Sequence, residues 1–279
     1  MLTNEKIRQI EEFVYEKPRS IQEIAEYLKK NWRTADRYVR EIIENNGTIS
    51  SKTFREGTRG ALKIVYWTSM EKRASSVFQE DLEKQILNAK RKEDFSAFDI
   101  FQHIDDKNKR VTIEEKSSEE TTNLKELAEI IKQTKKELIS LSGNLSYINL
   151  KNKSCSIFDE LENLIKGGVR IKALCRIDIS GKENIEKLLS LNFKYGKELV
   201  EIRHYEHPMR AFIIDKKIIR LKEIKEPTGK MHELNKKLFI FYTIRDKNWA
   251  EWIASVFLKM FNKSIGAEKR LQELNKIFV

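Results

Sequence analysis

Two short amphipathic helices separated by a tight turn are the feature that most constrains the fold of this 279-residue chain. In the first, SIQEIAEYLKK, Ser20 and Glu23 have the spacing of a capping box, in which each side chain binds the other residue's backbone N–H. The second helix, within NWRTADRYVREII, begins after Asn31, Trp32 and at most Arg33. So short a separation predicts a helix-turn-helix, the motif whose second helix lies in the major groove of DNA.

The second helix carries its charge on one stripe. Arg33, Arg37 and Arg40 occur at i, i+4 and i+7, so their guanidinium groups share one face. The opposite stripe is apolar and consists of Ala35, Tyr38, Val39, Ile42 and Ile43. The residues predicted to contact base edges are Arg33, Thr34, Arg37 and Arg40. Arginine suits this role because it pairs with guanine O6 and N7, although a basic stripe is also typical of a solvated helix face.

A β-hairpin is predicted directly after this helix. Asn46-Gly47 is expected to end the helix with a left-handed residue, and strands are expected at 48–55 and 61–67 around a glycine-flanked turn. In a winged helix such a hairpin holds phosphates, which position the protein without reading the sequence. The residues predicted to contact phosphates are Lys52, Arg55, Arg59 and Lys63.

The distribution of charge favours the same surface. Residues 1–28 hold four Lys/Arg against six acidic residues, whereas residues 29–67 hold nine against four. The net charge of the whole chain is +11, which favours a polyanionic partner. We therefore predict double-stranded DNA as the partner, the alternative being a winged domain that contacts protein.

A linking helix is predicted beyond residue 68. Its partial heptad seam consists of Met70, Ala74, Val77, Phe78, Leu82, Ile86 and Leu87. The seam favours a homodimer, because helix-turn-helix proteins usually bind two half-sites as two-fold dimers. The alternative is a linker packed on its own chain. A short helix in DFSAFDIFQHI and a polar stretch follow, in which only RVTIEE suggests a strand.

From Leu124 onward, helical and strand patterns alternate, which predicts an α/β domain with a mixed sheet. A hairpin is expected to turn at Lys216-Lys217, and a long terminal helix is expected from about Asp246. The predicted fold class is therefore α+β multidomain. Its parts are a winged helix-turn-helix at 1–68, linking or dimerisation helices at 69–104, and an α/β effector or oligomerisation domain at 105–279.

Several other classes of protein are not indicated. No apolar run approaches 18 residues, so no membrane span is predicted, and the charged N-terminal segment lacks a secretory h-region. We expect a cytoplasmic, nucleoid-associated protein. Cys155 and Cys175 are too few for a disulfide framework, and both are predicted to be reduced and buried. No motif indicates a metal or a cofactor.

The order of these segments resembles a known family. A winged helix-turn-helix, a linking helix and then an α/β domain with KELISLSG, LIKGGVRIKALC and RAFIID is similar to the TrmB-like family of archaeal transcription regulators. The resemblance implies a C-terminal domain with a phospholipase D-like fold. It also implies that this domain senses an effector, since some members bind sugars there, or that the protein coats DNA as chromatin-like members do.

Enzymatic activity is not predicted. Phospholipase D enzymes use His-x-Lys, four residues, then Asp, with the histidine as nucleophile. Counting back from Asp215 places Arg210 at the lysine position and Pro208 at the histidine position. His207 is one residue out of register, which in a strand turns it to the opposite face. Arg210 and Asp215 are instead expected to form a structural or anion-binding ion pair.

The sequence thus predicts a DNA-binding transcription regulator with a catalytically inactive C-terminal domain. The alternatives are an architectural protein that coats DNA and a phosphodiesterase. A small-molecule effector is a further predicted partner. The residues predicted to bind it are Arg176, Asp178, His204 and Arg210.

Overall fold

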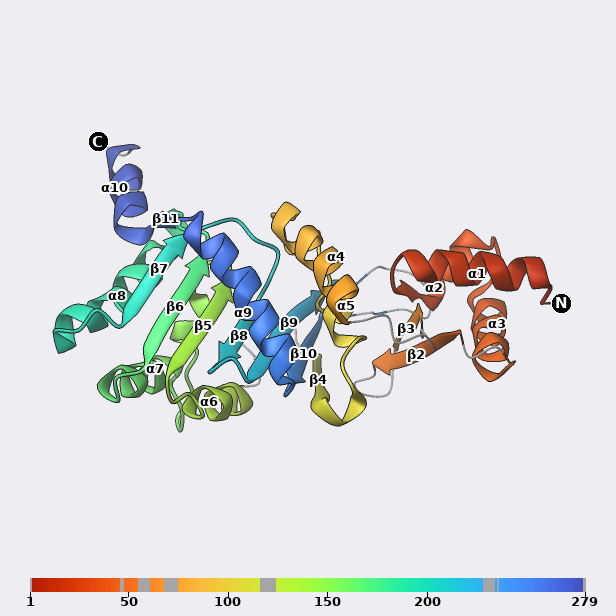
Figure 1. Ribbon diagram of the computed structural model, residues 1–279, viewed down its shortest axis with the longest axis horizontal. Coiled ribbons are helices and arrows are strands. Elements are labelled where there is room, and N and C mark those ends of the chain that lie inside the picture. The colour runs from red at the N-terminus through yellow and green to blue at the C-terminus, as the bar shows by residue number, and fades with distance from the viewer. Residues whose placement is uncertain are drawn as a thin grey trace.

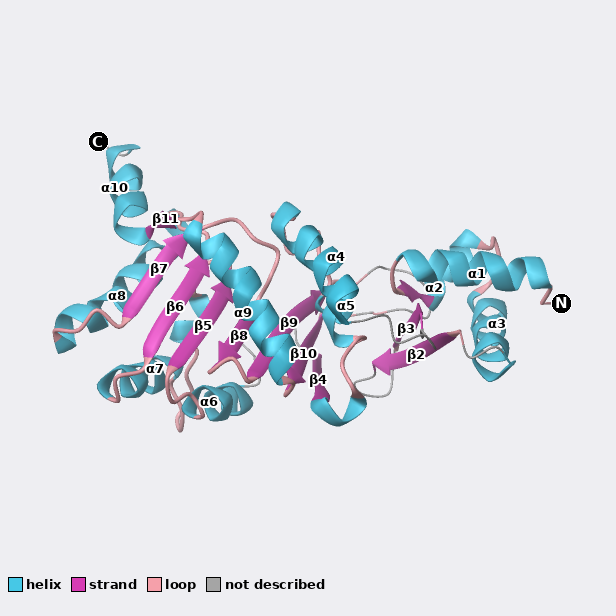
Figure 2. Cartoon of the chain, viewed as in Figure 1, coloured by secondary structure: helices cyan, strands magenta, loops and turns pink. Residues whose placement is uncertain are grey.

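The computed structural model describes residues 2–45, 48–54, 61–67, 75–115, 124–227, 234 and 236–277. The chain is elongated, with a small N-terminal unit at one end and a large sheet with its covering helices at the other (Figure 1). Helices and strands are interspersed throughout, as the colouring by secondary structure shows (Figure 2). The predicted α+β class and the large mixed sheet are confirmed. Within the described ranges, no helix combines the length and apolar character that crossing a membrane requires.

The N-terminal unit combines three helices with a small antiparallel sheet in the order β1-β3-β2. Its elements are α1 (Asn4–Glu16), β1 (Arg19–Ser20), α2 (Ile21–Tyr27), α3 (Trp32–Asn45), β2 (Ile49–Phe54) and β3 (Leu62–Trp67). The hairpin strands were expected, but the predicted turn between them and Asn46-Gly47 lie outside the described residues. β1 was not predicted, because a strand of two residues has no periodicity.

Local capping fixes where α2 and α3 begin. Ser20 Oγ accepts from Glu23 N (3.1 Å) and Glu23 Oε2 accepts from Ser20 N (2.7 Å), so the predicted capping box is confirmed. Asn31 Oδ1 accepts from Thr34 N (2.8 Å) and begins α3 in the same way. Trp32 and Arg33 therefore belong to α3, although the sequence pattern placed Trp32, and at most Arg33, in the turn.

The apolar stripe of α3 is buried as predicted, with Ala35, Val39 and Ile42 at 0% exposure. These residues form a core with Ile10 of α1, Ile24 of α2 and hairpin residues Ile49 and Val65. This packing attaches α3 to its unit by one face only.

Three further elements lead from the N-terminal unit to the large sheet. They are α4 (Ser75–Asn88), α5 (Ala97–Phe101) and the short 3-10 turn η1 (Asp106–Asn108). Leu82 and Ile86 of the predicted dimer seam are buried within the chain's own core, where α4 packs on α9 (Lys247–Asn262). The described part of the seam thus corresponds to the packed-linker alternative, and a homodimer through it stays without support.

The large sheet has the order β11-β7-β6-β5-β8-β9-β10-β4. Its strands are β4 (Lys109–Glu115), β5 (Glu137–Ser142), β6 (Arg170–Cys175), β7 (Val200–His204), β8 (Ala211–Ile214), β9 (Ile218–Lys225), β10 (Leu238–Ile244) and β11 (Ile265–Gly266). β5, β6 and β7 pair in parallel and the other pairs are antiparallel. The RVTIEE segment is confirmed as the strand β4.

Helices cover both faces of this sheet. One face packs on α6 (Leu124–Lys132), α7 (Ile157–Lys166), α8 (Lys182–Tyr195) and α10 (Ala267–Ile277). The other face packs on α4, α5 and α9, which runs diagonally across the strands (Figure 1). The turn of the β8–β9 hairpin has positive φ at Asp215 and Lys216, one residue earlier than predicted. Cys175 is buried, but Cys155 is only half-buried.

The β2–β3 hairpin joins the two ends of the molecule. Its Phe54 side chain is 1% exposed and lies edge-on to Phe98 of α5 (5.9 Å) and Tyr242 of β10 (6.5 Å). Tyr66 meets the same Phe98 ring at 5.4 Å. One face of the hairpin is therefore docked on the large sheet and its helices, while the other faces α3.

Candidate nucleic-acid interface

The arginines of α3 are exposed along one stripe. Arg33, Arg37 and Arg40 are all in the exposed class, and Thr34 beside them is half-buried. Arg33 lies over the Trp32 ring (5.8 Å) and Arg37 over the Tyr38 ring (5.3 Å). Such contacts extend the side chains across aromatic surface while their charged ends stay in solvent. The structure thus brings the predicted base-reading residues together.

The carboxylates near this stripe come from α3 itself. Arg37 Nε is 3.7 Å from Glu41 Oε1, and Arg40 Nη2 is 2.7 Å from Asp36 Oδ2. Asp36 Oδ1 also accepts from Lys63 Nζ (2.7 Å). Burial raises the pKa of Asp36, but the hydrogen bonds and charges of Lys63 and Arg40 outweigh it and leave that pKa below its usual range. Lys63 therefore ties β3 to α3 through an ionised carboxylate.

The hairpin residues predicted to contact phosphates do not form one set. Lys63 pairs with Thr53 across the hairpin and faces α3, whereas Lys52 pairs with Ile64 on the docked face. Neighbouring positions on a strand point to opposite faces, so the two lysines project from opposite sides of the hairpin. Lys52 is nevertheless exposed. Arg55 and Arg59 lie outside the described residues.

Two exposed basic residues of the turn before α3 were not among the predicted site residues. Lys29 and Lys30 are exposed and immediately precede the cap of α3 at Asn31. Lys29 has a φ of 53°, a conformation that closes the turn between the helices. The sequence shows these lysines as part of the same basic region, because the excess of basic residues begins at residue 29 and not at the start of α3.

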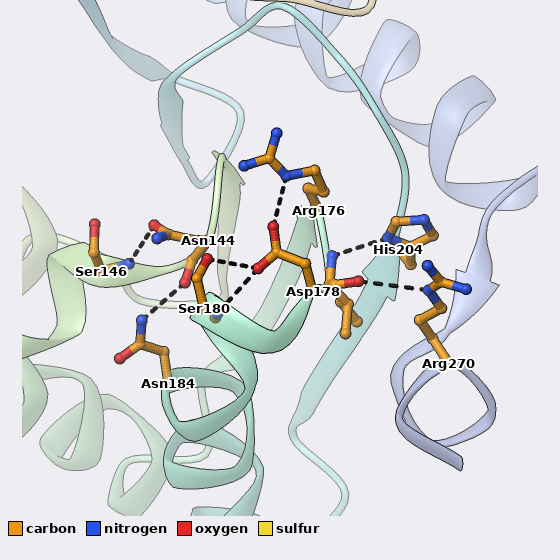
Figure 3. Close-up of polar contacts among 10 residues, drawn as sticks. Asn144, Ser146, Arg176, Asp178, Ser180, Asn184, His204 and Arg270 are labelled. Carbon is orange, nitrogen blue, oxygen red and sulfur yellow. Dashed lines mark hydrogen bonds and ion pairs between the residues drawn. The ribbon is translucent and has the colours of Figure 1, made fainter. Parts of the chain in front are cut away.

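Three of the four predicted effector residues meet at the carboxyl ends of β6 and β7 (Figure 3). Asp178 accepts from Arg176 Nε (2.9 Å), Ser180 Oγ (2.6 Å) and Gly181 N (3.1 Å). His204 Nδ1 accepts from Ile177 N (2.9 Å), and burial and then the charge of Arg270 lower its pKa. These groups fix the loop that leads into α8, so their hydrogen bonds serve the local backbone.

An asparagine network continues from this loop along the same edge of the sheet (Figure 3). Asn184 Nδ2 donates to the Asn144 carbonyl (3.0 Å), and Asn144 Oδ1 accepts from Ser146 N (3.2 Å). Asn149 Nδ2 donates to Asn184 Oδ1 (2.6 Å). The network holds the segment after β5, including the 3-10 turn η2 (Ser146–Asn149), against α8.

Two residues at or beside the positions aligned with the phospholipase D motif, His207 and Asp215, are hydrogen-bonded to the backbone. His207 Nε2–H donates to the Leu174 carbonyl (3.0 Å), and burial lowers the pKa of His207 to about 4. The Asp215 carboxylate accepts from the backbone N–H groups of Lys135 (2.9 Å), Lys136 (2.8 Å) and Glu137 (3.0 Å). Asp215 therefore anchors the start of β5.

The predicted ion pair between Arg210 and Asp215 is wrong. Arg210 precedes β8 and Asp215 follows it. Five residues of extended strand span roughly 16 Å, which no salt bridge crosses. Arg210 also lies apart from the effector loop, on the wall of a cavity beside α6 that Arg176, Asp178 and His204 do not line. In the parts of the chain that the structure describes, no three potential metal ligands come together.

No protein-family model and no curated protein matches this sequence. Solved structures are similar to the chain, and three of them follow here. The phospholipase D family member Nuc from Salmonella typhimurium is 12% identical, over 57% of this chain and 97% of that one, with a TM-score of 0.40. NucT from Helicobacter pylori is 13% identical, over 57% and 99%, with a TM-score of 0.39.

The third structure is that of TrmBL2, an archaeal chromatin protein described as showing a novel mode of DNA binding. It is 14% identical, over 94% of this chain and 93% of that one, with a TM-score of 0.40. Membership of the TrmB-like family stays a prediction. Sequence identities of 12–14% and TM-scores of 0.39–0.40 do not assign a function to this chain, so its function has to be argued from the arrangement of its own side chains.

Proposed function

We propose that this chain is a DNA-binding transcription regulator, with α3 as the recognition helix of a winged helix-turn-helix. The observation that carries the proposal is the contrast between the two stripes of α3. Ala35, Val39 and Ile42 are fully buried, while Arg37 and Arg40 on the other stripe have side chains 57% and 63% exposed. A helix held by one face and basic on the other is the arrangement that enters the major groove.

The ion pairs of Arg37 and Arg40 are weak enough for these arginines to exchange their carboxylate partners for groups on DNA. The Arg37–Glu41 and Arg40–Asp36 contacts are i,i+4 pairs on one exposed helix face. Such pairs contribute only about 0.3–0.5 kcal/mol. An arginine that is bidentate to guanine contributes about 1–3 kcal/mol. The carboxylates therefore orient the arginines without competing strongly with DNA, and they repel phosphates that approach out of register.

We propose further that the C-terminal unit has a binding role and no catalytic one. Residues adjacent in sequence on β9 and β10 face opposite sides of the sheet. Glu223 and Tyr242 face α5 and the docked hairpin, whereas Lys222 and Phe241 line the cavity beside α6. A ligand in that cavity would act on the strands that support the hairpin, and it would alter DNA affinity only by preferring one arrangement of the two units.

The test is a comparison of matched arginine variants in a duplex-binding assay. The double change Arg37→Ala with Arg40→Ala is expected to weaken binding by at least about tenfold for each lost contact. Arg8→Ala is the control, because Arg8 is also an exposed helix arginine paired at i,i+4, with Glu12. Equal losses in the double variant and in Arg8→Ala would sink the assignment of α3.

A genome-wide footprint of the bound protein decides between a regulator and an architectural coating protein. A regulator protects discrete sites, because specific sites bind about 10³–10⁷ times more tightly than bulk DNA. A coating protein protects long continuous tracts. Continuous protection with no preferred sequence would replace the regulatory proposal with the architectural one.

A further inference from the structure

A cavity of about 690 Å³ opens on the face of the large sheet that carries α6. Its floor is formed by β8, β9 and β10, and its walls by α6 and by the segment from Ser142 to Lys151. Small-molecule sites in proteins occupy roughly 300–1,000 Å³. The cavity is therefore large enough for a metabolite, and it is separate from the basic stripe of α3.

The charged residues that line the cavity are all basic, and one of them, Arg220, is paired with the Glu126 carboxylate of α6. Lys151, Arg210, Arg220 and Lys222 line the cavity, and among the described residues that line it none is acidic. A recess lined by charges of one sign concentrates ligands of the opposite sign, because low-dielectric walls focus the field. This lining favours an anion.

Two of these cations are fixed in position. The Arg220 side chain is 3% exposed; its guanidinium donates to Thr243 Oγ1 (3.2 Å) and Glu126 Oε2 (3.2 Å) and lies 4.8 Å from the centre of the Phe241 ring. Lys222 Nζ lies 4.8 Å from the centre of the Phe239 ring. Cations held this way lose little conformational freedom when a ligand binds.

The remaining lining suits an uncharged ligand body. Asn144 presents its side-chain amide beside the floor, and Tyr147 and Phe212 meet edge to face at 4.8 Å. Both polar atoms of the Asn149 amide are already bonded within the protein, to Asn184 and Lys187. Amides bind hydroxyl groups in either direction, and aromatic rings bind flat or apolar surfaces. The lining thus combines sites for a charged group, for hydroxyls and for a ring.

From this combination we propose that the cavity binds a small phosphate ester of nucleotide type, with its phosphate at Arg210 and Lys222, its ring toward Phe212 and its hydroxyls toward the side-chain amide of Asn144. A DNA duplex does not fit the recess, because its phosphates lie on a stiff helix and contact cations that project from a protein surface. In this cavity Arg220 and Phe241 are only 3% and 4% exposed. The proposal deepens the effector role given above. Binding can be measured without DNA, so the failure of one proposal is distinguishable from the failure of the other.

The test is calorimetric titration of the full chain with three probes: AMP, adenosine and inorganic phosphate. AMP should bind more tightly than either of the others, since only AMP carries both the charge and the ring. Lys222→Met and Arg210→Met should each weaken AMP binding by about tenfold or more, the effect of one lost charge-assisted contact. Lys132→Met is the matched control, because Lys132 is an exposed lysine of α6 that pairs with Glu160 outside the cavity.

Thermal melts of the variants establish that each one folds, and Lys222→Met keeps the test valid if Arg210→Met does not. Four outcomes overturn the proposal. They are no AMP binding at millimolar concentration, equal affinity for AMP and adenosine, binding of inorganic phosphate alone, and an equal loss in Lys132→Met. If the cavity variants lost affinity for DNA while AMP binding was unchanged, the lining would instead belong to the DNA interface.

Discussion

Arg37 on α3 and Arg220 on β9 show how burial alone separates two uses of the same side chain. Both have a carboxylate partner, Glu41 at 3.7 Å and Glu126 at 3.2 Å, but their side chains are 57% and 3% exposed. Water screens the first pair, so Arg37 can exchange Glu41 for another anion at little cost. The second pair is shielded, so Arg220 cannot lose Glu126 without leaving a charge unpaired. Exposed arginines suit an extended polyanion, and buried ones suit a fixed pocket.

Position in the fold produces this difference. Arg37 stands opposite a stripe of α3 that is buried in the core of its own unit, so its outward direction follows from helical periodicity. Arg220 alternates with Ile219 and Leu221, which face α9, and it is therefore directed into the layer beneath α6. A strand covered on both sides buries its polar residues as well as its apolar ones.

The same contrast explains which features the sequence could predict. The capping box of Ser20 and Glu23 and the stripe of Arg33, Arg37 and Arg40 depend on neighbours within one or two helical turns, and both are found as expected. The burial of Arg220 depends on Glu126, which is 94 residues away along the chain. No local pattern in KIIRLK distinguishes it from a surface residue.

The docked hairpin was missed for the same reason. Phe54 contacts Phe98 and Tyr242, residues that the sequence places in a linking helix and in a distant strand. Strand periodicity predicts that Lys52 and Lys63 point to opposite faces of the hairpin. It does not predict that the face of Lys52 is packed against the large sheet and its helices, because that contact is made with residues far away in the sequence. Arg176, Asp178 and His204 lie close together, and hydrogen bonds to the local backbone occupy Asp178 and His204, but their role in binding an effector stays a prediction.

The largest expected effect tests the buried member of the comparison. Arg220→Ala should lower the free energy of unfolding by about 3–5 kcal/mol, because it leaves Glu126 shielded without its partner. The measurement is chemical denaturation at pH 7. The double change Arg220→Ala with Glu126→Ala should recover part of the loss, since no charge is then left unpaired. A loss below about 0.5 kcal/mol in the single variant, the range of ordinary surface changes, would show that the pair is screened after all.

Asp99 of α5 extends the comparison to a shielded carboxyl. Burial first and the charge of Glu223 second raise its pKa to about 6, against the lowering charges of Lys225 and Lys17. The unfolded value is about 3.9, so the folded state binds more protons between these pH values and loses stability as pH rises through them. Asp99→Asn should therefore raise the free energy of unfolding by roughly 1–3 kcal/mol at pH 7 and leave it unchanged near pH 4. An equal gain at both pH values would show that the carboxyl charge is not the cause.

The exposed member of the comparison should matter for binding and not for folding. Arg37→Ala should change the free energy of unfolding by no more than about 0.5 kcal/mol. On a preferred duplex site it should cost about 1–3 kcal/mol of binding and relax the preference at one base pair. Competition between specific and random duplexes measures both effects. An equal loss on random DNA would make Arg37 a phosphate contact instead of a base contact.

A smaller effect is expected from the turn before α3. Lys29 is exposed beside the N-terminus of that helix, where a cation meets phosphates and not base edges. Lys29→Ala should weaken binding to specific and random duplexes alike, and it should flatten the slope of log K against log salt by about 0.9. Lys125→Ala, a change of an exposed lysine on α6, is the control. An unchanged slope in Lys29→Ala would place the turn away from DNA.

The smallest expected effect is none, and it concerns catalysis in the C-terminal unit. In-line attack on phosphorus needs a nucleophile, and the aligned position is Pro208. His207 cannot replace it, because its Nε2–H donates to the Leu174 carbonyl and its side chain is half-buried. A pKa of about 4 also keeps His207 neutral near pH 7.

Wild type and His207→Ala should therefore release p-nitrophenol from bis-p-nitrophenyl phosphate no faster than buffer, and both should bind DNA equally. Cleavage by both proteins would indicate a contaminant. Cleavage by wild type that His207→Ala abolishes would show that the C-terminal unit is an enzyme, and buried cations beside α6 would then have to be considered as part of its active site.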